Sequence, residues 1–156
     1  MPGKAGPVPE DMLARLRAIC LALPETREER AWTGTRWRIR TKTFAHVLVV
    51  EQGWPPAYAR AAGQDGPACV LTFRSDLAEF DPAIFSVAPF FKPVWWPDIA
   101  GVTLDGDTDW ETISGLIAAS YCRLAPKGLA ERVRSGRGAG GAATRASPGT
   151  TAGPAG

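Results

Sequence analysis

The sequence predicts an α+β fold, a two-layer sandwich in which the N- and C-terminal helices pack side by side on one face of an antiparallel sheet. Two observations lead to this fold class. Helical periodicity marks a segment near each end of the chain, whereas the segments between them carry strand patterns. No long helical segment separates the expected strands, which is typical of antiparallel pairing. Each helix has a single apolar stripe, so both helices must bury that stripe against the sheet.

The first helix is expected to start at Pro9, because proline suits the first helical turn. Glu10 and Asp11 follow it and favour the positive end of the helix dipole. Apolar residues then recur at helical spacing: Met12, Leu13, Leu16, Ile19, Cys20 and Leu23. Pro24 ends the pattern. The residues before the helix, 1–8, are predicted to form a flexible N-terminus.

Several strands are expected in the middle of the chain. Residues 36–40 alternate strictly between basic and apolar side chains, residues 44–50 form a β-branched apolar run, and residues 69–73 are a further apolar segment. Turns are expected at Thr33-Gly34 and at Thr41-Lys42, where a bulge in a continuous strand is the alternative. The other segments are expected to be a charge-dense connection at 25–30, a Gly-, Pro- and Ala-rich connection at 51–68, a short helix at 76–80 and a short edge strand at 101–104.

A capping box marks the start of the last helix. Thr108 and Glu111 have the spacing at which two side chains each accept a hydrogen bond from a backbone N–H group of the first turn. Apolar residues then recur near the helical period from Trp110 to Leu124, and Pro126 ends the helix.

One further helical turn is expected over 127–133. From residue 134 onward the chain consists mainly of Gly, Ala, Thr, Ser and Pro, with too little apolar surface to offset the entropy of ordering. The sequence therefore predicts a single domain over 9–133, followed by a disordered Gly-, Ala- and Arg-containing tail over 134–156.

The charge balance makes the expected domain nearly neutral. The 156 residues include 18 Lys and Arg and 16 Asp and Glu, a formal net charge of +2, but residues 1–131 hold 14 basic and 16 acidic residues. A nucleic-acid interface would therefore depend on local charge. No apolar run is long enough to span a membrane. The three cysteines lack the spacing of a disulfide framework or a metal site, and free thiols fit a cytoplasmic location.

A row of cations is the sharpest candidate site. Arg36, Arg38, Arg40 and Lys42 alternate along the expected strand, so their side chains would point to one face, roughly 6.5–7 Å apart. Such a row can contact successive phosphates of a nucleic acid, and contacts by all four cations would give a slope of log affinity against log salt of roughly −3.6 on duplex DNA. The alternative is the solvent face of a half-buried strand, where basic residues discourage pairing with another chain.

Short motifs resemble those of the MmcQ/YjbR family. They are Leu23-Pro24-Glu25-Thr26, Lys42-Thr43-Phe44-Ala45, Trp95-Trp96-Pro97, Leu104-Asp105, and Ser120-Tyr121 followed by Ala125-Pro126-Lys127. The resemblance covers about residues 10–133. It implies a compact α+β fold similar to that of frataxin (CyaY), and it carries the description of a DNA-binding protein.

The similarity to frataxins also raises iron binding, which in those proteins uses acidic residues of the first helix. Here that helix offers only Glu10 and Asp11, followed by Arg15 and Arg17, so iron is not expected.

An aromatic, proline-rich segment gives an alternative function. The stretch 85–96 holds Phe85, Phe90, Phe91, Trp95 and Trp96 between prolines, which excludes a central strand. These rings are expected to cap the core, since a buried aromatic removes about 150–250 Å² from water. Alternatively, they line a groove for a small molecule or a protein, with four contact residues: Phe90, Phe91, Trp95 and Trp96.

No catalytic constellation is recognised. His46 is the single histidine, and no nucleophile or carboxylate beside it forms a known relay. The phosphate-binding, nucleophile-elbow and zinc motifs are missing as well. We therefore expect a cytoplasmic protein without catalytic residues, metal or cofactor, which binds DNA weakly and largely independently of sequence.

Overall fold

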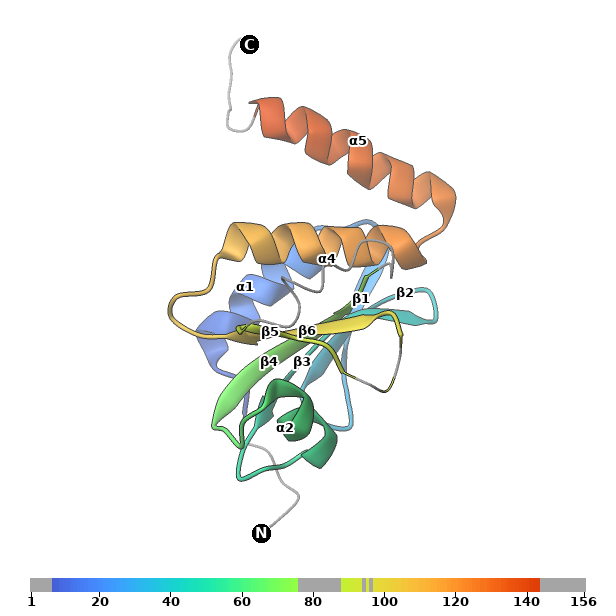
Figure 1. Ribbon diagram of the computed structural model, residues 1–156. Coiled ribbons are helices and arrows are strands. Elements are labelled where there is room, and N and C mark those ends of the chain that lie inside the picture. Colours follow the sequence, from blue (N-terminus) through green and yellow to red (C-terminus); the bar gives the residue numbers. More distant parts are fainter. Residues whose placement is uncertain (1–6, 76–87, 94, 96, 144–156) are drawn as a thin grey trace.

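The chain folds into a six-stranded antiparallel sheet with helices on both faces (Figure 1). The computed structural model describes residues 7–75, 88–93, 95 and 97–143. The elements are α1 (Glu10–Leu21), β1 (Thr26–Arg30), β2 (Thr35–Ile39), β3 (Lys42–Val50), α2 (Pro56–Ala62), β4 (Ala68–Arg74), β5 (Phe90–Phe91), β6 (Ile99–Leu104), α4 (Trp110–Leu124) and α5 (Lys127–Ala143). The strand order is β1-β2-β3-β4-β6-β5, and every neighbouring pair is antiparallel.

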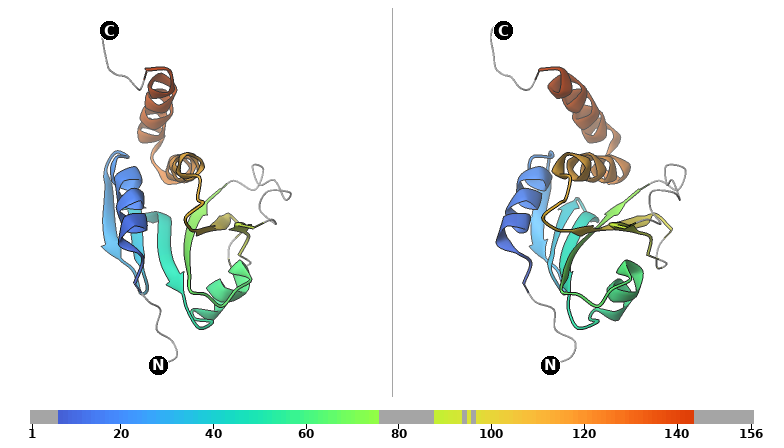
Figure 2. Two further views of the ribbon diagram at one scale, coloured as in Figure 1. Left: turned by 90° about the vertical axis from the view of Figure 1, so that its left-hand side faces the viewer. Right: turned by 60° about the vertical axis from the view of Figure 1, so that its left-hand side comes forward.

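The fold class predicted from the sequence is confirmed. Helices α1 and α4 lie on one face of the sheet, which we call the helix side, and α2 lies on the other (Figure 2). The main core lies between this face of the sheet and helices α1 and α4. Its largest fully buried side chains include Trp37, Ile39, Phe44, Ile117 and Tyr121.

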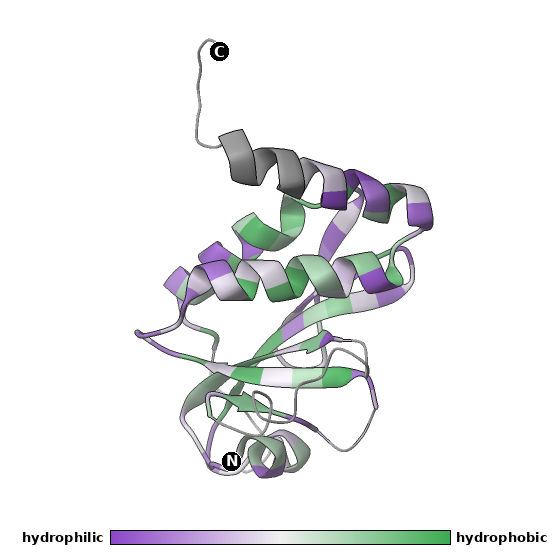
Figure 3. Ribbon diagram, turned by 45° about the horizontal axis from the view of Figure 1, so that its top comes forward, coloured by the Kyte–Doolittle hydropathy of each residue, from purple (hydrophilic) through white to green (hydrophobic). Residues whose placement is uncertain are grey.

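A smaller core lies on the opposite face, beneath α2. Leu48 and Val50 of β3 alternate with Val47, which belongs to the main core, so the central strands are buried on both sides. This double burial explains why the central strands carry mostly hydrophobic residues (Figure 3). Phe91 of β5 joins the smaller core and closes over Gly101, where an added Cβ would lie 2.3 Å from the ring.

The expectation of a charge-dense connection at 25–30 is wrong, because residues 26–30 of this segment form strand β1. The segment Thr-Arg-Glu-Glu-Arg pairs along its whole length with β2 and forms one edge of the sheet. Charged side chains occur on both faces of this strand, so the apolar alternation that reveals a half-buried strand is missing. Charges on an edge strand also discourage pairing with another chain.

The boundaries of the other helices and strands differ less from the expected ones. The connection at 51–68 contains the helix α2, and the strand expected at 101–104 is not an edge, because the two-residue β5 pairs with it. Asp109, rather than Thr108, caps α4: its carboxylate accepts hydrogen bonds from the backbone N–H groups of Glu111 and Thr112. Thr108 accepts from the N–H of Asp105 instead, which stabilises the preceding turn.

The C-terminal helix α5 extends ten residues beyond Val133, where the last helical turn was expected to end. Residues 144–156 of the expected tail, the N-terminal residues 1–6 and the helix expected at 76–80 lie outside the described residues. Among the helices that are described, none combines the length and the apolar character needed to cross a membrane.

Candidate functional site

Three arginine side chains lie close together on β1 and β2, on the sheet face opposite α1 and α4. Trp37 and Ile39 of β2 point into the core on the helix side, so the alternating Arg36 and Arg38 point away from it. In β1, Arg27 lies directly across from Arg38, and Glu29 across from Arg36. Cross-strand neighbours share a face of the sheet. We call this set of four residues (Arg27, Glu29, Arg36 and Arg38) the arginine face.

A single carboxylate is shared by these arginines. Glu29 accepts from Arg27 Nε at 2.8 Å and from Arg36 Nη2 at 2.9 Å, and Arg38 Nη1 lies 3.4 Å away. The hydrogen bonds from Arg27 and Arg36, together with the charge of Arg38, lower the pKa of Glu29 to about 2. Three guanidinium groups against one carboxylate leave the arginine face with a net charge of +2.

Glu28 does not reduce this excess, because its side chain lies on the helix side. There it accepts hydrogen bonds from Arg17 of α1 (Nε, 2.9 Å) and from the indole N–H of Trp37 (2.9 Å). The hydrogen bond from Arg17 is the main cause of its lowered pKa. Strand β1 therefore presents one acid to each face of the sheet.

The interpretation that Arg40 and Lys42 continue the row on one strand is wrong. Strand β2 ends at Ile39, and a two-residue turn at Arg40-Thr41 leads into β3, with Arg40 in the left-handed region (φ 57°). Lys42 lies across from Ile39, a core residue, and so falls out of the alternation. Arg40 pairs with Glu25 at 3.0 Å, and more than half of each side chain is exposed, so the pair is weak.

Arg38 is the most enclosed of the three arginines, with 20% of its side chain exposed. Its Nη2 donates to the carbonyl of Thr41 and ties β2 to the turn. Its Nε is buried and has no hydrogen-bond partner among the described residues.

A small aromatic pocket adjoins the arginine face. This cavity of about 210 Å³, which we call the aromatic pocket, is lined by Trp32, Arg36, His46, Tyr58 and Trp95, among others. Tyr58 and Trp95 lie with their ring centroids 4.6 Å apart, and Trp32 lies 6.4 Å from Tyr58. Arg36 belongs to both the pocket and the arginine face.

His46 connects two walls of the aromatic pocket by hydrogen bonds. One ring nitrogen, Nε2, lies 2.8 Å from the carbonyl of Thr33 and donates to it, which leaves Nδ1 to accept from the hydroxyl of Tyr58 at 3.4 Å. Burial lowers the pKa of His46 below its ordinary value of 6.5, and the charge of Arg36 adds to this effect. The ring is therefore neutral at pH 7, the state in which Nδ1 can accept.

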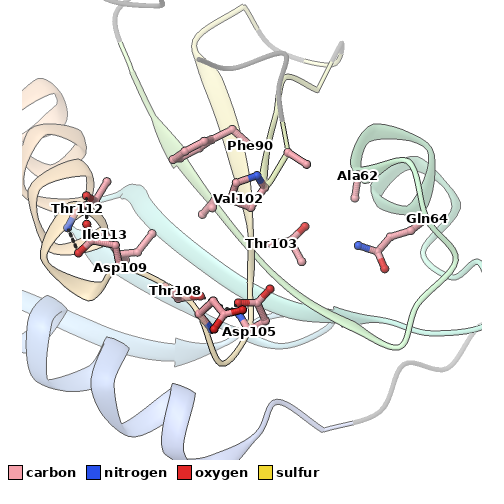
Figure 4. Close-up of a pocket in the computed structure, with 13 residues that line it drawn as sticks. Ala62, Gln64, Phe90, Val102, Thr103, Asp105, Thr108, Asp109, Thr112 and Ile113 are labelled. Atoms are coloured by element: carbon pink, nitrogen blue, oxygen red, sulfur yellow. Dashed lines mark hydrogen bonds between the residues drawn. The ribbon is translucent and has the colours of Figure 1, made fainter. Parts of the chain in front are cut away.

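A second, larger cavity of about 620 Å³ lies between α2, the β5–β6 pair and the start of α4 (Figure 4). Phe90 and Val102 form an apolar wall, and the turn before α4 contributes acidic side chains. Two of these acids already have structural partners: Asp105 accepts from the N–H of Asp107, and Asp109 caps α4.

Of the four aromatic residues of the alternative function, the three that the structure describes do not line a common groove. Phe91 is 6% exposed and belongs to the smaller core, as the capping interpretation expected. Phe90 lines the larger cavity and Trp95 the aromatic pocket. Trp96 and Phe85 lie outside the described residues.

Sequence reasoning missed Arg27, Glu29, Trp32 and Tyr58 as site residues. Arg27 and Glu29 could have been found from the period of two that they share with Arg36 and Arg38 across the hairpin loop 31–34. Nothing in the sequence signals that α2 carries Tyr58 over His46, because that approach depends on the path of the whole 51–68 connection.

Acidification should weaken the fold through Glu28 and Glu29. Both carboxylates have a pKa below 4.5 in the folded chain, so they stabilise it fully above that pH and lose this contribution as the pH falls toward their folded values, about 2 for Glu29. The free energy of unfolding, measured with urea between pH 6 and pH 2.5, should fall across this window. The variant E29Q should show a shallower fall, and a profile identical to that of the unmodified chain would contradict the arrangement around Glu29.

The described residues offer no cluster of three or more His, Cys, Asp or Glu side chains that could hold a metal ion. Cys20 and Cys69 are buried, and burial raises the pKa of Cys69 to about 12, which makes its thiol a poor nucleophile.

Comparison with known protein families gives a match to most of the chain. The YjbR family model matches residues 21–123, about two thirds of the chain, and this range includes the arginine face and the aromatic pocket. No curated protein matches the chain.

Proposed function

The chain belongs to the YjbR family, and from that premise we propose that it binds DNA through the arginine face, mainly by contacts to backbone phosphates. The observation that carries the proposal is the ratio of three arginines to one carboxylate at Glu29. The excess of positive charge is local, since the expected domain as a whole is nearly neutral. DNA binding is also what the resemblance to this family implied.

The ion pairs with Glu29 leave Arg27 and Arg36 accessible to a ligand, whereas Arg38 is more enclosed, with 20% of its side chain exposed. Arg27 and Arg36 keep 50% and 37% of their side chains exposed, and exposed ion pairs are weak. Arginine presents five N–H donors in a planar fork, so one guanidinium can contact Glu29 and a phosphate oxygen together. Arg36 and Arg38 lie two residues apart on one strand, roughly 6.5–7 Å. They can contact neighbouring phosphates, with Arg27 as a third cation.

We propose that binding is not followed by a chemical step. A general base works best with a pKa near the working pH, whereas the pKa of Glu29 is about 2.

Removing the charge of Glu29 should strengthen DNA binding. The variant E29Q frees the three arginines from their shared carboxylate and raises the net charge of the arginine face from +2 to +3. Affinity for a short duplex, measured by fluorescence anisotropy at low salt, should rise several-fold, by roughly the effect of one additional phosphate contact.

The matched control is E131Q, because Glu131 is exposed on α5, on the helix side of the molecule. It changes the net charge by the same amount and should leave the affinity nearly unchanged. Equal effects of the two substitutions would mean that only total charge matters, and the arginine face would then lose its support. A thermal melt of each variant checks that the fold is intact.

A further inference from the structure

We propose that the aromatic pocket receives one unstacked base of a DNA single strand whose phosphates lie on the arginine face. This inference rests on the proposed function and deepens it, because it assigns to the site a preference for single-stranded over duplex DNA. A base paired within a duplex is held in its stack and cannot enter such a pocket without being extruded.

The rings of the pocket are placed for stacking. Tyr58 and Trp95 form a tilted pair at 4.6 Å, and Trp32 lies 6.4 Å from Tyr58 and 5.7 Å from Trp54. Trp32 is 66% exposed, more than any other large hydrophobic side chain among the described residues. An exposed indole beside a cavity is a surface on which a base can stack, whatever its identity, since every base has a π-face.

The volume of the pocket limits the occupant. At about 210 Å³ it is smaller than the pockets of about 300–1,000 Å³ that hold drug-sized ligands or cofactors. A single planar heterocycle is an occupant of suitable size. Its sugar and phosphate must then remain outside, where the arginines lie.

Arg36 joins the two parts of the site. Its guanidinium contacts Glu29 on the arginine face, while its side chain lines the aromatic pocket. It also lies directly across from His46 in the β2–β3 pair. Because cross-strand neighbours have their Cβ atoms about 4.5–5.5 Å apart, a phosphate at Arg36 places the base of the same nucleotide within reach of the pocket.

The pocket is held in shape before a ligand arrives. His46 is a positioning residue: it donates to Thr33, which fixes the loop that carries Trp32, and it accepts from Tyr58 on the other wall. The same loop turns at Gly34 (φ 76°), where a Cβ would lie 1.9 Å from the carbonyl oxygen of Val47. The loop therefore lies directly on β3. Because the pocket is already ordered, little of the binding free energy is lost in ordering it.

The test compares an oligodeoxythymidine single strand with a duplex of the same length, for the unmodified chain and for Trp32→Ala. Loss of one stacking partner should weaken single-strand binding by about 5- to 150-fold, the range for one stacked base. Duplex affinity should stay within about twofold. Trp32→Phe keeps an aromatic face and should recover part of the loss, whereas Leu21→Ala, an exposed apolar site on α1, should change neither affinity.

A third probe is an abasic strand of equal length, which offers phosphates without bases. It should bind the unmodified chain and Trp32→Ala equally well. If Trp32→Ala changes single-strand, duplex and abasic binding alike, or changes none of them, the pocket does not receive a base, although the arginine face can still bind DNA. If the unmodified chain binds none of the three probes, the proposed function and this inference both fail.

Discussion

Replacing Arg36 and Arg38 together by glutamine should lower the affinity for duplex DNA about tenfold or more at low salt. Both guanidinium groups lie on the same face of β2, and together they provide two of the three phosphate contacts that we propose. Each contact releases counterions, so the slope of log affinity against log salt should flatten from roughly −2.7 to roughly −0.9. Anisotropy titrations at several salt concentrations measure both quantities.

Two matched variants separate the arginine face from bulk charge and from folding. K127Q/R134Q removes the same total charge from α5, where both side chains are exposed, and should leave the salt slope unchanged. R36K/R38K keeps the two charges as point cations and should retain most of the affinity but lose the planar fork. A uniform loss in all three double variants would show that the position of the cations on β2 is irrelevant.

Replacing Trp37 by alanine should destabilise the fold by ~3–5 kcal/mol, the usual cost of removing a large aromatic side chain from a core. Trp37 has the largest fully buried side chain among the described residues, and it lies on the same strand as Arg36 and Arg38 but on the opposite face. Its removal leaves a cavity in the main core. Glu28 keeps its hydrogen bonds to Arg17, so the cost arises mainly from lost packing.

The measurement is the free energy of unfolding from urea titrations at pH 7. Trp37→Phe keeps a ring in the core and should cost clearly less than Trp37→Ala. A cost below about 1 kcal/mol for the alanine variant would contradict the placement of β2 between the main core and the arginine face.

The fold class followed from the sequence because the two long helices and the central strands have strong, regular patterns. Helix α1 begins within a residue of the expected position at Pro9, and β3 includes the whole apolar run at 44–50. Strand β1 was missed because its stability comes from pairing with β2, and its five residues carry no apolar alternation. The expected capping residue was wrong by one position because Thr108 and Asp109 are both able to cap, and only the path of the chain decides between them.

The candidate site was predicted in part. Alternation along 36–40 correctly identified Arg36 and Arg38 as neighbours on one face, since the period of two is local. It failed beyond Ile39, where the turn at Arg40-Thr41 interrupts the strand. The pairing of the arginines with Glu29 and the approach of Tyr58 to His46 depend on contacts between distant segments, which no single-segment pattern contains.

The most direct test of the account is the salt dependence of duplex DNA binding by the unmodified chain. Contacts from Arg27, Arg36 and Arg38 to three phosphates predict a slope of log affinity against log salt of roughly −2.7. A slope near zero, or no measurable binding at low salt, would contradict the proposal that the arginine face binds the DNA backbone.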